Sequence, residues 1–145
     1  MSTNRKAVVA VIETMPARLV APHGESMGMT MKLGYDSSDP YAVSATMETP
    51  SLSVTWAFAR ELLEGGLREP TGAGDVHVRP SLDADGRVVL ALELCSDGGD
   101  ALVELPTGAV SDFVDRMLTV VPSGTESEHL DVDEALGAIF AAEAA

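Results

Sequence analysis

The stretch from Gly34 to Val43 reads GYDSSDPYAV, and it decides the fold because it places a turn between two alternating segments. Apolar or aromatic residues occupy every second position from Met27 to Tyr35, and they do so again from Tyr41 to Met47. This period of two is typical of half-buried strands. Asp, Ser and Pro in the sequence DSSDP favour a tight turn. The stretch therefore predicts an antiparallel hairpin.

The alternation resumes from Leu52 to Phe58 and then changes to helical spacing over residues 60–64. Glycine is common just after the last turn of a helix. The pair Gly65 and Gly66 is therefore predicted to end a short helix that follows directly on a strand.

Three further strands are predicted over residues 75–82, 87–95 and 100–105. They are joined by DADG at 83–86 and SDGG at 96–99, which are both strong hairpin connectors. The sequence TGAG at 71–74 superficially suggests a phosphate loop, but a phosphate site needs the N-terminus of a helix and this stretch precedes a strand. A turn is the favoured interpretation.

Apolar residues at helical spacing predict an amphipathic helix from Thr107 to Val121, which Pro122 and Gly124 then end. A final helix is predicted over residues 131–140, because Asp131 and Glu134 resemble a capping box. At the other end, the apolar run 7–12 predicts a buried first strand that Glu13 interrupts.

The chain has 145 residues, of which 46% are hydrophobic, and this is enough for one folded domain over residues 1–145. No run approaches the roughly 18 apolar residues that a membrane helix needs, so we expect no direct membrane insertion. The single cysteine and the lack of a secretory signal favour the cytoplasm. The residues themselves thus indicate an α+β domain with antiparallel strands.

The net charge of −14 comes from 23 acidic and 9 basic residues. Nucleic-acid binding depends on Lys and Arg side chains that neutralise phosphates, and this balance disfavours it. No basic residue follows Arg116, so the last part of the chain has a surface of one sign.

Few residues point to catalysis, to a cofactor or to a metal ion. His23, His77 and His129 are far apart and have no neighbouring ligands at zinc-site spacing. His77 is expected to face outward from its strand. Cys95 becomes a candidate nucleophile if a His approaches it, but a buried small hydrophobe is the favoured interpretation. No pair of carboxylates stands out, so we expect no catalytic, cofactor or metal residues.

Five residues are candidates for a protein interface. Tyr41 and Trp56 are aromatic and belong either to the core, which is favoured, or to an interface. Arg60 lies where a strand becomes a helix and either forms local ion pairs or is buried. Val89 and Val103 are apolar strand residues at an interface or on a second buried face.

The chain resembles the SsgA-like (SALP) family of actinobacterial sporulation and cell-division proteins from Gly34 to about Phe140. The resemblance is carried by DPYAV at 39–43, WAFARELL at 56–63, GDV at 74–76, VP at 121–122 with GTE at 124–126, and residues 130–139. The first 33 residues are less alike.

The resemblance implies two antiparallel β-sheets with packed helices, similar to the whirly fold, in the order β-β-β-β-α-β-β-β-α-α. It also implies a homotrimer in the cytoplasm that is recruited to division septa. Its expected role is that of a non-enzymatic adaptor that positions septa through contacts with the tubulin-like division protein FtsZ or with a sister SsgA-like protein.

Two alternatives stay open at this point. One is a whirly-like module that binds single-stranded nucleic acid through exposed aromatic and basic residues. The other is a small-molecule binder or an enzyme that uses a cleft between the sheets.

Overall fold

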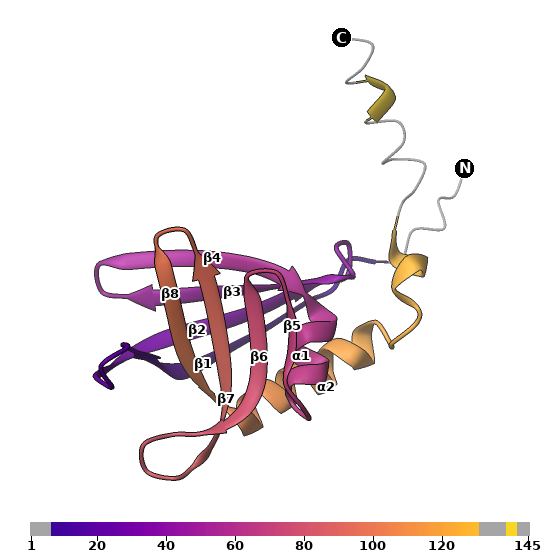
Figure 1. The fold of residues 1–145 in the computed structure, drawn as a ribbon. Coiled ribbons are helices and arrows are strands. Elements are labelled where there is room, and N and C mark those ends of the chain that lie inside the picture. Colours follow the sequence, from indigo (N-terminus) through magenta and orange to yellow (C-terminus); the bar gives the residue numbers. More distant parts are fainter. Residues whose placement is uncertain (1–6, 131–138, 142–145) are drawn as a thin grey trace.

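The computed structural model describes residues 7–130 and 139–141 of the chain. Most of these residues belong to a strongly curved antiparallel sheet and two helices (Figure 1). The elements in chain order are β1 (Ala10–Val20), β2 (Ser26–Asp36), β3 (Ala42–Thr49), β4 (Leu52–Ala59), α1 (Arg60–Gly66), β5 (Thr71–Ala73), β6 (Val76–Leu82), β7 (Val88–Ser96), β8 (Gly99–Pro106), α2 (Thr107–Val120) and the 3₁₀ helix η1 (Glu126–His129).

The strands form two four-stranded meanders that share one hydrogen-bonded ladder. Their order is β4-β3-β2-β1-β8-β7-β6-β5, with every neighbouring pair antiparallel. β1 pairs with β8 over only three residues, Arg18–Val20 with Leu102–Glu104. In Figure 1 the strands of the first meander cross those of the second. The resemblance implied two separate sheets, and the structure corrects this to one curled sheet. The reason is that β1, a strand of the first meander, also pairs with β8 of the second.

The core lies on the inner side of this curl. α2 contacts β1, β7 and β8, whereas α1 contacts β4, β5 and β6. The predicted helix from Thr107 to Val121 is thus confirmed within one residue, and its apolar side is buried. The fully buried large side chains from sheet and helices include Met31, Leu33, Leu63, Leu90, Leu92, Leu94, Leu105, Phe113 and Met117.

β1 corrects the predicted first strand. The strand begins later than expected and continues through Pro16, and Val8, Val9 and Ile12 are exposed rather than buried. The residues that face the core are instead Val11, Met15 and Ala17. Glu13 and Pro16 concealed this pattern, because a charge and a proline both argue against a strand interior.

The glycine pair at the end of α1 also differs from the prediction. Gly65 and Gly66 are the last residues of α1 and do not follow it. A side chain at Gly66 would lie 2.3 Å from Val78 Cγ1, so this glycine lets α1 approach β6 closely. The helix therefore uses glycine for packing as well as for its end.

The hairpin turns lie where the sequence predicts them. Gly86, in the connection between β6 and β7, and Gly99, the first residue of β8, both have positive φ angles. The stretch at 71–74 forms β5 and its turn into β6, a strand that the sequence pattern did not predict. The predicted final helix over residues 131–140 lies almost wholly outside the described residues.

Candidate functional site

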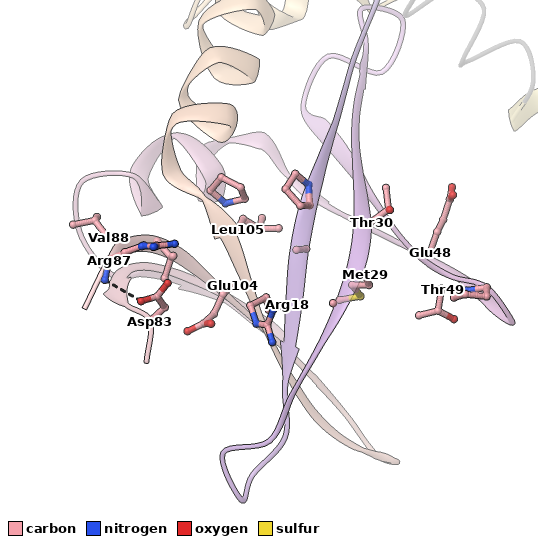
Figure 2. Close-up of a pocket in the computed structure, with 16 residues that line it drawn as sticks. Arg18, Met29, Thr30, Glu48, Thr49, Asp83, Arg87, Val88, Glu104 and Leu105 are labelled. Carbon is pink, nitrogen blue, oxygen red and sulfur yellow. Dashed lines mark hydrogen bonds between the residues drawn. The ribbon is translucent and has the colours of Figure 1, made fainter. Parts of the chain in front are cut away.

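A groove of about 900 Å³ opens where β1 and β8 separate from each other. Its walls come from the ends of β1 and β2, the β3–β4 turn, the β6–β7 turn and the end of β8 (Figure 2). The groove is lined by Pro16, Ala17, Arg18, Gly28, Met29, Thr30, Glu48, Thr49, Pro50, Asp83, Arg87, Val88, Val89, Glu104, Leu105 and Pro106.

The register of the sheet explains why a groove forms here. The β1–β8 ladder ends at Arg18, and Pro16 lies just beyond it with no N–H group to continue the pairing. Two otherwise buried residues, Ala17 and Leu105, line the groove where the strands part. The hollow is therefore a consequence of the short junction between the meanders.

Charges of both signs surround this groove. Figure 2 shows Arg18 and Glu104 near its middle, Asp83 and Arg87 on one side and Glu48 on the other. Arg18 donates from Nε and Nη2 to Ser26 Oγ, at 3.1 and 2.6 Å. Asp83 Oδ1 accepts from the backbone N–H of Arg87 at 2.9 Å. With two arginines and three carboxylates, the lining is not a continuous cationic track for a polyanion.

A second polar centre is built around the buried guanidinium of Arg60, which is only 2% exposed. Its Nη1 donates to the backbone oxygen of Val121 at 2.8 Å and to Tyr35 Oη at 3.2 Å. Its Nε and Nη2 lie 3.3 Å from carboxylate oxygens of Glu64 and Glu126. The guanidinium thus connects the start of α1 with β2, with the end of α2 and with η1.

The acid–base properties of this centre follow from burial and from Arg60. Burial raises the pKa of Tyr35 above its ordinary value, and the nearby Arg60 opposes this. Burial likewise raises the pKa of Glu64 against the effect of Arg60. Hydrogen bonds from the backbone, first of all its own, lower the pKa of Glu126, and Arg60 acts in the same direction. Two carboxylates and one guanidinium therefore form a buried network of ion pairs that joins these elements.

The structure separates the five predicted interface residues into two groups. Arg60 is buried, and Val103 is fully buried because it pairs with Leu92 on the core face of the sheet. Both are therefore in the buried alternative that the sequence left open, and neither side chain reaches the surface of this fold. Tyr41 is 49% exposed, Trp56 packs partly buried against the core, and Val89 lies in the groove.

The residues weighed for catalysis or metal binding lie apart from the groove. His77 is exposed, as predicted, and Cys95 is partly buried at the end of β7. Burial and nearby carboxylates, led by Asp100, raise the pKa of Cys95, which disfavours the nucleophilic thiolate. The described residues contain no group of three or more His, Cys, Asp or Glu side chains that could hold a metal ion.

A cleft between the sheets was one of the alternatives left open by the sequence, but the residues that line this groove were not predicted. Its lining comes from five separate stretches, and none of them carries a catalytic or binding motif. Pro16 inside the long first strand was the one local signal, since proline restricts sheet pairing. No helix in the described ranges is both long and apolar enough to cross a membrane.

Comparison with known proteins gives a consistent result. Residues 29–126 match the family model described as "Streptomyces sporulation and cell division protein, SsgA". The chain is 45% identical over 125 residues to the sporulation-specific cell division protein SsgB of Streptomyces coelicolor, with 86% of this chain and 90% of that protein covered. It is 43% identical over 144 residues to SsgB of Salinispora tropica, with 97% and 99% covered.

Two solved structures have the same fold. One, from work on SsgB mutations that correlate to longitudinal cell division during sporulation of Streptomyces coelicolor, has a TM-score of 0.78 and 41% identity, and covers 84% of this chain and 96% of that one. The other is an SsgA-like sporulation-specific cell division protein from Thermobifida fusca, with a TM-score of 0.80 and 30% identity over 94% and 98% of the two chains. The chain therefore belongs to the SsgA family of sporulation and cell-division proteins.

Proposed function

We propose that this protein is a non-enzymatic regulator of sporulation-type cell division that positions septa through contacts with other proteins. The observation that carries the proposal is the identity of 43% across nearly the whole length of a protein named for sporulation-specific cell division. The matched family is a cell-division family and not a known enzyme family. The proposed role follows from the function for which those relatives are named.

Its proposed partners are the division protein FtsZ or a sister SsgA-like protein, which would recruit it from the cytoplasm to septa. We also propose a whirly-like arrangement of the two meanders and a homo-oligomer, with the trimer as the state implied by the family resemblance. The surplus of 14 negative charges supports docking against proteins, since such a surface repels polyanions and anionic membranes.

The surface chemistry also supports docking over catalysis. Of the four groups with a shifted pKa among the described residues, three surround Arg60 and the fourth is Cys95. Active sites usually gather shifted groups in an accessible cleft. None of these four groups lines the groove, and the three around Arg60 hold the fold together.

The test is deletion of the gene in its native host, followed by imaging of septa during sporulation. We expect misplaced or missing septa, restored by the wild-type gene at its own locus. Normal septation and spore formation in the deletion strain would contradict the proposal. A strain complemented with a variant of exposed Arg68, such as Arg68→Ala, serves as a matched control that should divide normally.

A second candidate function is binding of a small molecule in the groove. The observation in its favour is the volume of about 900 Å³, which lies within the range of ligand pockets. Substitution of Val89 by Trp would fill the groove without changing its charge. If the groove binds a ligand that is needed for division, Val89→Trp should reproduce the deletion phenotype while the protein stays folded, and normal division would exclude this candidate.

A further inference from the structure

The ladder between β1 and β8 stops at a pair of prolines, one on each strand. Its last step pairs Arg18 with Glu104. If the same register continued, Pro16 would face Pro106 two positions further along. Proline has no N–H group, so neither strand supplies a donor at this step. The groove therefore opens where both strands have lost the donor that would have extended the sheet.

The backbone of Pro16 leaves one hydrogen-bond acceptor in this gap. The N–H of Ser37 donates to the oxygen of Val9 at 2.9 Å, and the register between β1 and β2 is unbroken from there onward. Odd-numbered residues of β1 therefore bond to β2, and even-numbered residues turn their backbone groups toward β8. The carbonyl of Pro16 thus points into the gap, where Pro106 has no N–H to offer.

The carboxylate of Glu104 adds a second acceptor near the middle of the groove (Figure 2). Glu104 is half-buried and faces Arg18 across the ladder. The guanidinium of Arg18 is directed to Ser26 instead, because its Nε and Nη2 both donate to Ser26 Oγ. Glu104 therefore forms no ion pair or side-chain hydrogen bond with any other residue that the structure describes. A carboxylate can only accept, so this group lacks a donor.

The rest of the lining is apolar in the middle and charged at the ends. Val89 and Leu105 lie beside the gap, while Glu48 and Arg87 come from the turns at the two ends. Figure 2 shows these two charged residues on opposite sides of the groove. Arg87 is exposed and belongs to the β6–β7 turn. The middle of the groove thus combines apolar surface with two acceptors that lack a donor.

This combination is complementary to an arginine side chain. A guanidinium has five donors on opposite edges of one plane, so it can bond to a carboxylate and a carbonyl at once. Two positions along a strand are roughly 7 Å apart, which one guanidinium can bridge between Glu104 and Pro16. The aliphatic stem of arginine packs well on apolar surface such as that of Val89 and Leu105. The net charge of −14 also attracts basic partners.

We propose that the groove docks an arginine side chain from an exposed segment of a partner protein, with its guanidinium between the Glu104 carboxylate and the Pro16 carbonyl. The groove is open and not enclosed, which suits a side chain that another protein presents. The inference rests on the proposed docking function and names the chemistry by which a partner is recognised.

Fluorescence anisotropy with the full-length chain tests this directly. The probe is the peptide Ser-Val-Arg-Val-Ser with fluorescein at its N-terminus, and the control peptide has citrulline, which is uncharged and of similar shape, in place of arginine. The arginine peptide should bind saturably and at least about tenfold more tightly than the citrulline peptide. Equal affinities, or no saturable binding of the arginine peptide, would overturn the proposal. Tighter binding of free spermidine than of the peptide would also overturn it, because the groove would then be a polyamine site.

Three variants locate the binding and determine its sign. Glu104→Gln should weaken binding of the arginine peptide at least about tenfold. Glu69→Gln removes the same charge from an exposed position outside the groove and should change the affinity by less than about twofold. Arg18→Met removes a like charge and should strengthen binding, whereas it would weaken the binding of an anion. Equal losses in the two glutamate variants would assign the binding to the overall charge and overturn the proposal.

The outcome is separate from that of the deletion experiment. Misplaced septa in the deletion strain together with no selective peptide binding would reject this inference and leave the proposed function in place. Normal septa together with selective binding would reject the proposed function and leave the arginine site. Thermal unfolding of Glu104→Gln and Arg18→Met, compared with the wild type, verifies that both variants are folded in the titrations.

Discussion

Arg60 shows how one side chain connects distant parts of the chain. It follows β4 directly, and its guanidinium contacts three residues that are far away in the sequence, Tyr35, Val121 and Glu126. A planar guanidinium spreads five donors over three nitrogens, whereas an ammonium group has three donors on a single nitrogen. The residue is thus a structural link between distant parts of the chain.

Replacement of Arg60 by Met should destabilise the fold by about 3 kcal/mol or more, because it leaves two partly buried carboxylates without their cation. Arg60→Lys keeps the positive charge but loses the planar set of donors, so a smaller loss of stability is expected. Urea denaturation provides the measurement. Arg68→Met, at an exposed position, should stay within about 0.5 kcal/mol of the wild type. Equal stability of Arg60→Met and wild type would refute this role.

Tyr35 should make stability depend on alkaline pH. Its hydroxyl donates to the backbone oxygen of Pro40 at 2.9 Å, and burial raises its pKa above 10.0. A group whose pKa is higher in the folded state contributes stability below its unfolded pKa and loses it as pH rises. The melting temperature should therefore fall above about pH 10 in the wild type.

Tyr35→Phe tests this directly. This substitution should lower the free energy of unfolding by about 1 kcal/mol at neutral pH through the lost hydrogen bonds. It should also make the melting temperature fall less steeply above about pH 10. Tyr41→Phe is the control, since Tyr41 is 49% exposed. A decline of the same size in Tyr35→Phe and in wild type would assign the alkaline effect to other groups.

At the scale of the elements, local chemistry predicted most strands and the long helix. The DSSDP turn and the two glycine-containing connectors lie where expected, and α2 buries Val110, Phe113, Val114 and Met117. These features depend on residues close in sequence, so their patterns are visible without the fold. β1 was misplaced because Glu13 and Pro16 argue against a strand interior, and β5 was missed because it has only three residues and contains Gly72.

Two glycines in helices should respond to alanine in opposite directions. Gly66→Ala places a methyl group 2.3 Å from Val78 Cγ1 and should destabilise by about 1–3 kcal/mol. Gly108 lies in α2 with open space around it, so Gly108→Ala should stabilise by up to about 1 kcal/mol. Thermal unfolding of both variants measures this. Similar shifts of the same sign would contradict the close packing of α1 on β6.

At the scale of the whole molecule, the three-residue junction between β1 and β8 determines both the curl of the sheet and the groove. That junction pairs residues from opposite ends of the chain, such as Leu19 and Val103, which meet only once the chain has folded. Apart from Pro16, no local pattern could therefore have indicated it. The family resemblance supplied the expected architecture and function, while the charge supplied an independent argument against polyanion binding.

The most direct measurement of the central claim is co-sedimentation of the purified full-length chain with FtsZ from the same host, with a sister SsgA-like protein in a parallel reaction. The account predicts that the chain pellets with FtsZ polymers or binds the sister protein in a saturable way. Arg68→Ala, at an exposed position outside the groove, should behave as the wild type. A chain that binds neither protein at any concentration tested would contradict the claim that it works by docking to the division machinery.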